Sequence, residues 1–152
     1  NTCFCGHGTM QGSRFGADNP NDGTDWGSKW SGSFDQSIDN AFDGYLRHGT
    51  RARTGGNAVL ITMSGVSITV NEYVKVYVEN NYPSTVTAVI DGVTYTSAHT
   101  GDDVHTHKFI GNGTLTQLTA VNNGSQGRTY FEGVIVDGYL LKNNTTSNGW
   151  NY

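Results

Sequence analysis

The sequence predicts an all-β fold, an antiparallel β-sandwich of jelly-roll type with an irregular, glycine-rich N-terminal arm. At 152 residues the chain has the length of one ordinary domain with one hydrophobic core. Only 14% of its residues are charged, too few for a long solvated helix or a coiled coil. Short apolar runs alternate with turn signals about every 8–12 residues, which is typical of a sandwich or jelly roll.

The composition divides the chain into three parts. Residues 1–35 are rich in glycine and carry a dense group of turn formers at positions 18–23, so an irregular arm is expected there. Residues 36–142 hold the strand signals and form the expected sandwich domain, and residues 143–152 form a polar tail. Between residues 35 and 45 the spacing of Phe34, Ile38 and Phe42 favours at most one or two short helical turns.

Eight short segments predict strands. The run 58–63 is continuously apolar, which indicates a strand buried on both faces. Segment 72–78 alternates, with valines on one face and Tyr73, Lys75 and Tyr77 on the other. Asp-Gly pairs at 91–92 and 137–138 predict type I′ hairpins, whose two central residues need positive φ. The expected strands are 58–63, 72–78, 85–90, 93–97, 104–110, 114–121, 130–136 and 139–141. No segment between them could form a crossover helix, so the sheets should be antiparallel.

Composition and motifs exclude several function classes. The formal net charge of −4 provides no basic field for nucleic acid, and no run approaches the roughly 20 apolar residues of a membrane span. No nucleophile elbow, phosphate-binding loop or zinc-protease motif is present. The long carboxylates Glu72, Glu79 and Glu132 are expected on solvated strand faces. The sequence therefore predicts a protein that is not an enzyme.

Two groups of residues suggest metal binding weakly. His105 and His107 are two apart in a strand and so share a face, but zinc needs at least a third ligand. Asp18, Asp22 and Asp25 offer oxygen ligands for calcium, although a proline occupies a position where an oxygen ligand belongs. Two solvated histidines and a loop of Asx turns are the favoured interpretations. No cofactor is expected, with calcium as the alternative.

Cys3 and Cys5 are too closely spaced for an easy mutual disulfide. Two reduced thiols are the favoured interpretation. The alternative is a bond to another subunit, which would make these residues part of an inter-subunit contact, or a bond to a part of the polypeptide that this sequence does not contain.

Aromatic residues in polar, glycine-rich surroundings are the candidate binding residues. Trp30, Trp150 and Tyr152 are predicted to contact glycans or protein partners, because exposed aromatic faces stack on sugar rings and fill partner pockets. For Trp30 and Trp150, packing over the ends of a small core is an equally good interpretation. For Trp26, packing in the core is the favoured interpretation.

Several short motifs together resemble a known module. They are AFDG at 41–44 followed by the polar stretch 51–56, VKVY at 74–77, IDG at 90–92, GTLT at 113–116 and FEGVIVDGYLL at 131–141. In this order they resemble a β-sandwich module of structural proteins of tailed bacteriophages, especially marine cyanophages. The resemblance covers about residues 36–142. It implies that Phe42 enters the core while the next two residues turn the chain.

The resemblance implies a structural protein of the virion, such as an appendage, a tail fibre or a capsid decoration, with adhesion to glycans as an additional role. Its expected partners are further copies of itself, with a trimer as the first expectation, other virion proteins and host-surface glycans. The arm 1–35 is then expected to lie across a neighbouring subunit. One alternative is a secreted, extracellular carbohydrate-binding module that uses exposed tryptophans and tyrosines. A further alternative is a subunit of a self-assembling extracellular filament.

Overall fold

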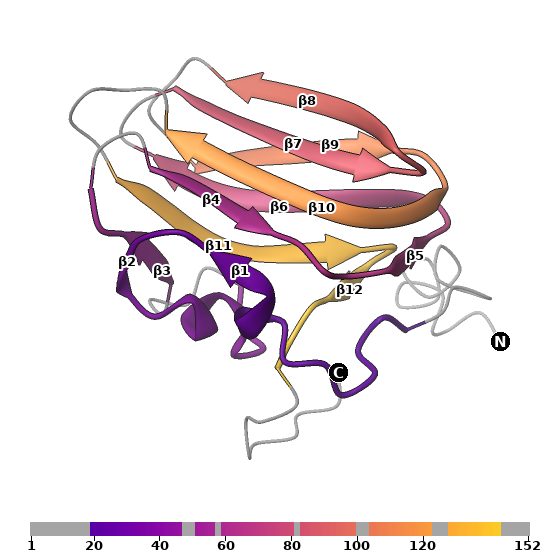
Figure 1. The fold of residues 1–152 in the computed structure, drawn as a ribbon, viewed down its shortest axis with the longest axis horizontal. Coiled ribbons are helices and arrows are strands. Elements are labelled where there is room, and N and C mark those ends of the chain that lie inside the picture. The colour runs from indigo at the N-terminus through magenta and orange to yellow at the C-terminus, as the bar shows by residue number, and fades with distance from the viewer. Residues whose placement is uncertain are drawn as a thin grey trace, which may run out of the picture.

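The structure, a computed structural model, describes residues 19–46, 51–56, 59–80, 83–99, 104–122 and 128–143. Within these ranges the chain forms a two-layered antiparallel β-sandwich, which confirms the predicted fold class (Figure 1). Its 3₁₀ turns are η1 (Gly27–Lys29) and η2 (Ile38–Phe42). Its strands are β1 (Trp30–Ser31), β2 (Phe34–Gln36), β3 (Ala52–Thr54), β4 (Leu60–Met63), β5 (Ile68–Val70), β6 (Tyr73–Asn80), β7 (Ser84–Ile90), β8 (Val93–His99), β9 (Val104–Ile110), β10 (Gly113–Asn122), β11 (Thr129–Val136) and β12 (Tyr139–Leu140).

Each layer of the sandwich is a six-stranded sheet. Sheet A has the strand order β1-β4-β10-β7-β8, with β5 also paired to β10. Sheet B has the order β2-β3-β11-β6-β9, with β12 also paired to β11. Every pairing is antiparallel, as expected from connections too short for crossover helices.

The two Asp-Gly turns form as predicted. Asp91 and Gly92 have φ values of 51° and 76°, and Asp137 and Gly138 have values of 50° and 87°. Positive φ at both central positions is the requirement of a type I′ turn, whose twist matches that of the flanking strands. These turns fix the register of the β7–β8 and β11–β12 hairpins.

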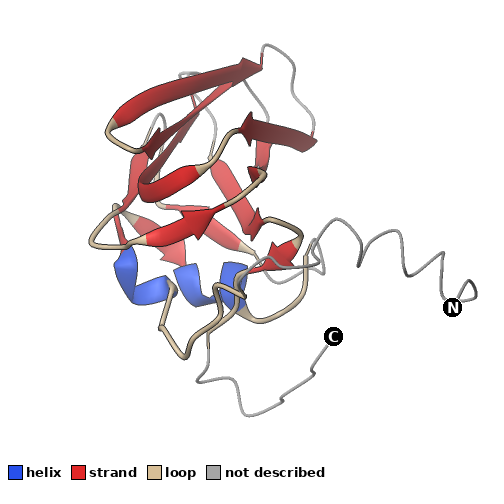
Figure 2. Ribbon diagram, turned by 90° about the vertical axis from the view of Figure 1, so that its right-hand side faces the viewer, coloured by secondary structure: helices blue, strands red, loops and turns tan. Residues whose placement is uncertain are grey.

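Both sheets and η2 bury aromatic rings in one core. Trp30 of β1 lies with its ring centroid 4.5 Å from that of Phe131 on β11 and 6.4 Å from that of Phe42 at the end of η2. Ser37 caps η2, because its hydroxyl accepts a hydrogen bond from the backbone N–H of Asp39. The burial of Phe42 confirms its predicted place in the core. The two 3₁₀ turns lie beside each other at one edge of the sandwich (Figure 2).

The described part of the N-terminal arm belongs to the sandwich, which corrects the boundary expected at residue 35. Strands β1 and β2 pair with β4 and β3. Trp26 and Trp30 are only 4% and 8% exposed, so this segment buries its own apolar residues. Asn143, expected in the polar tail, is buried too: its side chain accepts from the Gly27 N–H and donates to Asp39. Residues 1–18 and 144–152 lie outside the described residues.

The prediction that both faces of 58–63 are buried is wrong. Within β4, Ile61 and Met63 point into the core while Leu60 is 54% exposed. The strand therefore has one core-facing side and one solvent-facing side, as strands of antiparallel sheets commonly do. Across the described residues, no helix has the length and hydropathy to cross a lipid bilayer.

Candidate functional site

The two solvent-facing sides of the sandwich differ in chemistry. Sheet A presents a row of hydroxyl residues that runs in register across five strands: Ser31, Thr62, Thr119, Thr87 and Thr96. Most of the remaining outward residues on this side are threonines or aliphatic residues. Among its described outward residues none is charged and none is aromatic, so it offers no stacking ring and no ionic contact.

Sheet B presents aromatic and charged side chains instead. The alternation of β6 buries Val74, Val76 and Val78 and turns the odd-numbered residues outward. On the neighbouring edge strand β9, Thr106, Lys108 and Ile110 share the same outward side. We call five of these residues the tyrosine platform: Tyr73, Lys75, Tyr77, Lys108 and Ile110.

The register of β6 and β9 brings the platform together. Tyr73 lies opposite Ile110, which is 78% exposed, and Lys75 lies directly opposite Lys108. The ammonium nitrogens of Lys75 and Lys108 lie 5.3 and 4.7 Å from the centroid of the Tyr73 ring. Both distances are within the range of cation–π attraction. The Tyr73 ring, the exposed Ile110 side chain and two ammonium groups thus lie next to one another on the surface of sheet B.

Tyr77 faces a position that has no side chain. Its partner on β11 is Gly133, which follows a bulge and has a φ of +154°. A Cβ at this glycine would lie 3.1 Å from Leu46 Cδ1 and 3.3 Å from Leu140 Cδ1. Gly133 is itself buried, so this position beside Tyr77 is covered by Leu46 and Leu140 and has no room for a side chain.

Tyr130 and a network of ion pairs lie next to the platform, on β11. Arg51 places its guanidinium 4.3 Å above the Tyr130 ring and pairs with Glu79. Its Nη1 also lies 3.9 Å from Oε1 of Glu132. Glu132 sits in the bulge of β11 and is buried, which corrects its expected place on a solvated face. The arginine is therefore held in place by its own chain.

Asp35 continues this network toward β2. It accepts a hydrogen bond of 2.8 Å from Arg53 Nε and lies 3.6 Å from Arg128 Nη1. The hydrogen bond from Arg53, aided by the positive charges of both arginines, holds the pKa of Asp35 below its ordinary value. Each arginine described on this side of sheet B is consequently ion-paired.

The Asp137 carboxylate fixes the start of β6 and with it Tyr73. It accepts hydrogen bonds from the backbone N–H groups of Asn71, Glu72 and Tyr73, at 2.8, 2.7 and 3.0 Å. The Asp137 N–H in turn donates to the Tyr73 carbonyl at 3.0 Å. A buried carboxylate with three donors is a rigid junction, so the first platform ring stands on an ordered backbone.

The sequence-predicted binding residues lie elsewhere. Trp30 is in the core against Phe131, so its predicted contact with a glycan or partner is wrong, and the core interpretation holds. The remaining candidates Trp150, Tyr152, Cys3 and Cys5 lie outside the described residues. Tyr73 and Tyr77 are not among the sequence-predicted binding residues. The alternation of segment 72–78 places them with Lys75 on one face of a strand, but it does not identify that face as a binding surface.

His107 is a core residue that joins the two sheets. It is fully buried, with Nε2 lying 3.0 Å from Ser84 Oγ and Nδ1 lying 2.9 Å from Ser97 Oγ, and both serines belong to sheet A. The expectation of a solvated histidine is therefore wrong, because β9 packs against the edge of the other sheet. Both ring nitrogens are engaged, so neither is poised for a metal. For His105 only the backbone is described.

The described aspartates among the calcium candidates accept hydrogen bonds from neighbouring residues of their own loop. Asp22 accepts from the Thr24 N–H at 3.1 Å and from the Thr24 hydroxyl, and these bonds lower its pKa. Asp25 accepts from the Ser28 N–H at 3.3 Å. Asp18 lies outside the described residues. Among the residues that are described, no three His, Cys, Asp or Glu side chains cluster as metal ligands do.

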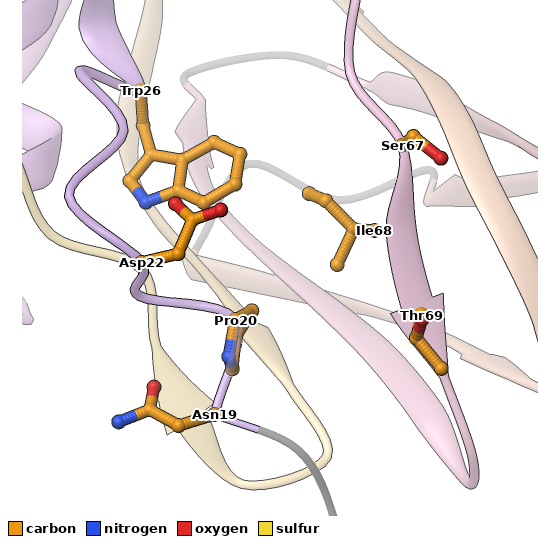
Figure 3. Close-up of a pocket in the computed structure, with 7 residues that line it drawn as sticks. All are labelled: Asn19, Pro20, Asp22, Trp26, Ser67, Ile68 and Thr69. Atoms are coloured by element: carbon orange, nitrogen blue, oxygen red, sulfur yellow. The ribbon is translucent and has the colours of Figure 1, made fainter.

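A pocket of about 160 Å³ lies between this loop and β5 (Figure 3). Pro20, Asp22 and Trp26 line it on the side of the loop, and Ile68 and Thr69 line it on the side of β5. Ligand pockets commonly measure about 300–1,000 Å³. This one is too small for a typical organic ligand, which leaves the open side of sheet B as the better candidate.

Comparison with known proteins gives only distant likenesses. No family model and no curated protein sequence matches the chain. Among solved structures, a module named TmCBM61 in complex with β-1,4-galactotriose has 12% identity and a TM-score of 0.49, covering 82% of this chain and 96% of its own. The CBM32 of AlyQ in complex with 4,5-unsaturated mannuronic acid has 16% identity and a TM-score of 0.44, covering 70% and 92%. A mutant of CBM29-2, a family 29 carbohydrate binding module, has 10% identity and a TM-score of 0.46, covering 72% and 92%.

Proposed function

We propose that the chain is a carbohydrate-binding module whose binding surface is the tyrosine platform. The observation that carries the proposal is the outward pair Tyr73 and Tyr77 on one strand, bordered by the highly exposed Ile110. A sugar ring has an apolar C–H face and polar edges. A tyrosine offers the complementary combination of an apolar ring and a hydroxyl that forms hydrogen bonds.

The geometry suits a saccharide chain better than a small molecule. Residues four apart in a strand are about 13 Å apart, so Tyr73 and Tyr77 would contact different sugar units of one oligosaccharide. Lys108 and Ile110 of the platform are exposed and Tyr73, Lys75 and Tyr77 are half-buried, so the platform is part of the molecular surface and not an enclosed pocket. Rings that stand on a hydrogen-bonded sheet also lose little conformational freedom on binding.

The proposal is tested by isothermal titration calorimetry against a panel of plant, algal and bacterial polysaccharides. Wild type binds at least one of them. Tyr73→Ala and Tyr77→Ala each weaken that binding at least tenfold, because each variant removes a stacking ring. Tyr95→Ala is the matched control, since Tyr95 is 44% exposed but belongs to β8 of the other sheet. Failure to bind any member of the panel, or equal binding by the Tyr73 and Tyr77 variants, would overturn the proposal.

The resemblance to phage appendage proteins adds a proposed setting in which the module is displayed on a virion and meets glycans of the host surface. Appendage proteins act in symmetric copies, so this setting predicts a homo-oligomer, with a trimer as the first expectation. Light scattering of the purified chain tests it, with and without reductant. A stable trimer supports the virion setting, and loss of assembly in reductant implicates Cys3 and Cys5. A monomer under all conditions supports a secreted module.

A further inference from the structure

We infer that the platform selects anionic saccharides, with Lys75 and Lys108 together holding a carboxylate or sulfate group carried by the sugar. This inference rests on the proposed function and names the substrate class of the same site. It is carried by the placement of the two lysines, by the lack of an acidic partner among the described residues, and by their shared contact with Tyr73.

The two lysines lie close enough together for their positive charges to repel each other. Lys75 and Lys108 are direct cross-strand partners in the β6–β9 pairing, an arrangement that destabilises a sheet when both residues carry the same charge. The whole chain has only four lysines and a net charge of −4. Half of the lysines of an acidic protein are thus placed opposite each other on one solvent-facing side.

The neighbouring cations differ from this pair. Arg51, Arg53 and Arg128 each have a carboxylate partner within 4 Å, supplied by Glu79, Glu132 or Asp35. Neither platform lysine has an ion-pair partner among the described residues. The chain therefore neutralises its arginines on this side of sheet B and leaves the positive charge of the lysine pair available to a ligand.

Both lysines contact the same aromatic ring, that of Tyr73. Its ring attracts both ammonium groups, which lie 4.7 and 5.3 Å from the ring centroid. The negative potential of the ring face offsets part of the mutual repulsion of the lysines. The ring itself stands on the backbone that the Asp137 carboxylate anchors. Two ammonium groups with six N–H donors are thus pre-positioned for one anion.

The positive charge of Lys75 also lies between the two tyrosines of the platform along β6. Lys75 is midway between Tyr73 and Tyr77 on the same outward side of β6. A sugar ring stacked on Tyr77 would bring a substituent on its edge toward the lysine pair. Stacking and charge recognition would then act on one saccharide chain, and a neutral polymer would make only the first of the two contacts.

Titration calorimetry with matched polymers tests the inference. The probes are a neutral galactan, polygalacturonate, a sulfated galactan and, as a polyanion without sugar, polyglutamate. Wild type binds one of the two anionic glycans at least tenfold more tightly than the galactan, and the preference shrinks as salt is raised. The comparison of carboxylated with sulfated polymer identifies the preferred anion. In the double variant Lys75→Gln, Lys108→Gln this preference is lost, so that its affinities for the anionic glycans and for the galactan become equal.

Lys29→Gln in η1 is the matched control and leaves every affinity unchanged, since Lys29 lies outside the platform. Equal binding of neutral and anionic polymers, or an anionic preference that survives in the double variant, would overturn the inference and leave the proposed function standing. If wild type bound polyglutamate as tightly as the preferred anionic glycan, the inference that the sugar takes part in anion recognition would be overturned. Failure to bind any of the glycans would count against the proposed function itself.

Discussion

The Asp137 carboxylate provides the sharpest stability prediction, because the chain contains its own control. Asp137 and Asp91 occupy the same position of two Asp-Gly turns, with φ values of 50° and 51°. Asp137 is buried and accepts three backbone N–H bonds. Asp91 is exposed and accepts one, of 2.7 Å, from the Thr114 N–H. Alanine imposes the same backbone strain at both positions, so the two variants differ mainly in the hydrogen bonds lost.

The magnitude follows from these bonds. Each backbone donor that loses a buried acceptor costs about 1–3 kcal/mol. Two additional donors at Asp137, together with the burial of the site, predict that Asp137→Ala lowers the free energy of unfolding by about 3 kcal/mol more than Asp91→Ala. For a domain of this size the corresponding gap in Tm is roughly 6–12 °C. Urea unfolding and calorimetry of both variants measure it. A difference below about 1 kcal/mol would refute the anchoring role of Asp137.

Three further predictions concern the core, the ion pairs and a turn. Trp30→Ala destabilises the fold by about 3–5 kcal/mol in urea unfolding but leaves the glycan affinity of the folded protein unchanged; a selective loss of affinity would restore Trp30 as a binding residue. The hydrogen bond from Arg53 lowers the pKa of Asp35 below the ordinary value of 3.8, so the ion pair stabilises the fold above pH 3.8 and this stabilisation is lost as the pH falls through the lowered pKa. The difference in Tm between wild type and Asp35→Asn should therefore shrink between pH 5 and pH 2. A difference in Tm that stays constant over this range would contradict the role of the ion pair. Gly113→Ala, at a φ of +139° with its Cβ overlapping the Asp91 carboxylate, costs about 2 kcal/mol, which an unchanged urea midpoint would disprove.

Local sequence signals predicted the parts of the fold that local physics determines. The Asp-Gly pairs located both type I′ hairpins, because few residues tolerate the positive φ that these turns need. The alternation in β6 assigned Tyr73, Lys75 and Tyr77 to one side of a strand, as observed. These features depend on neighbours in the sequence and need no knowledge of the partner strands.

Features that depend on partner strands were missed. Trp30 stands among serine and glycine residues, which suggested exposure, but its burial follows from the pairing of β1 with Met63 of β4. His107 is buried because β9 packs against β8, and its partners Ser84 and Ser97 are 23 and 10 residues away. The platform likewise needs the β6–β9 register, since only the register places Lys108 opposite Lys75.

The central claim is that the outward side of sheet B, and specifically the tyrosine platform, binds a saccharide chain. An NMR titration of the isotope-labelled protein with the oligosaccharide that calorimetry identifies tests this claim most directly. The account predicts that amide shifts concentrate at residues 73–77 of β6 and 106–110 of β9, with the amides of β7 and β8 unmoved. Shifts that concentrate instead on the threonine side of sheet A, or around the pocket beside Trp26, would contradict it.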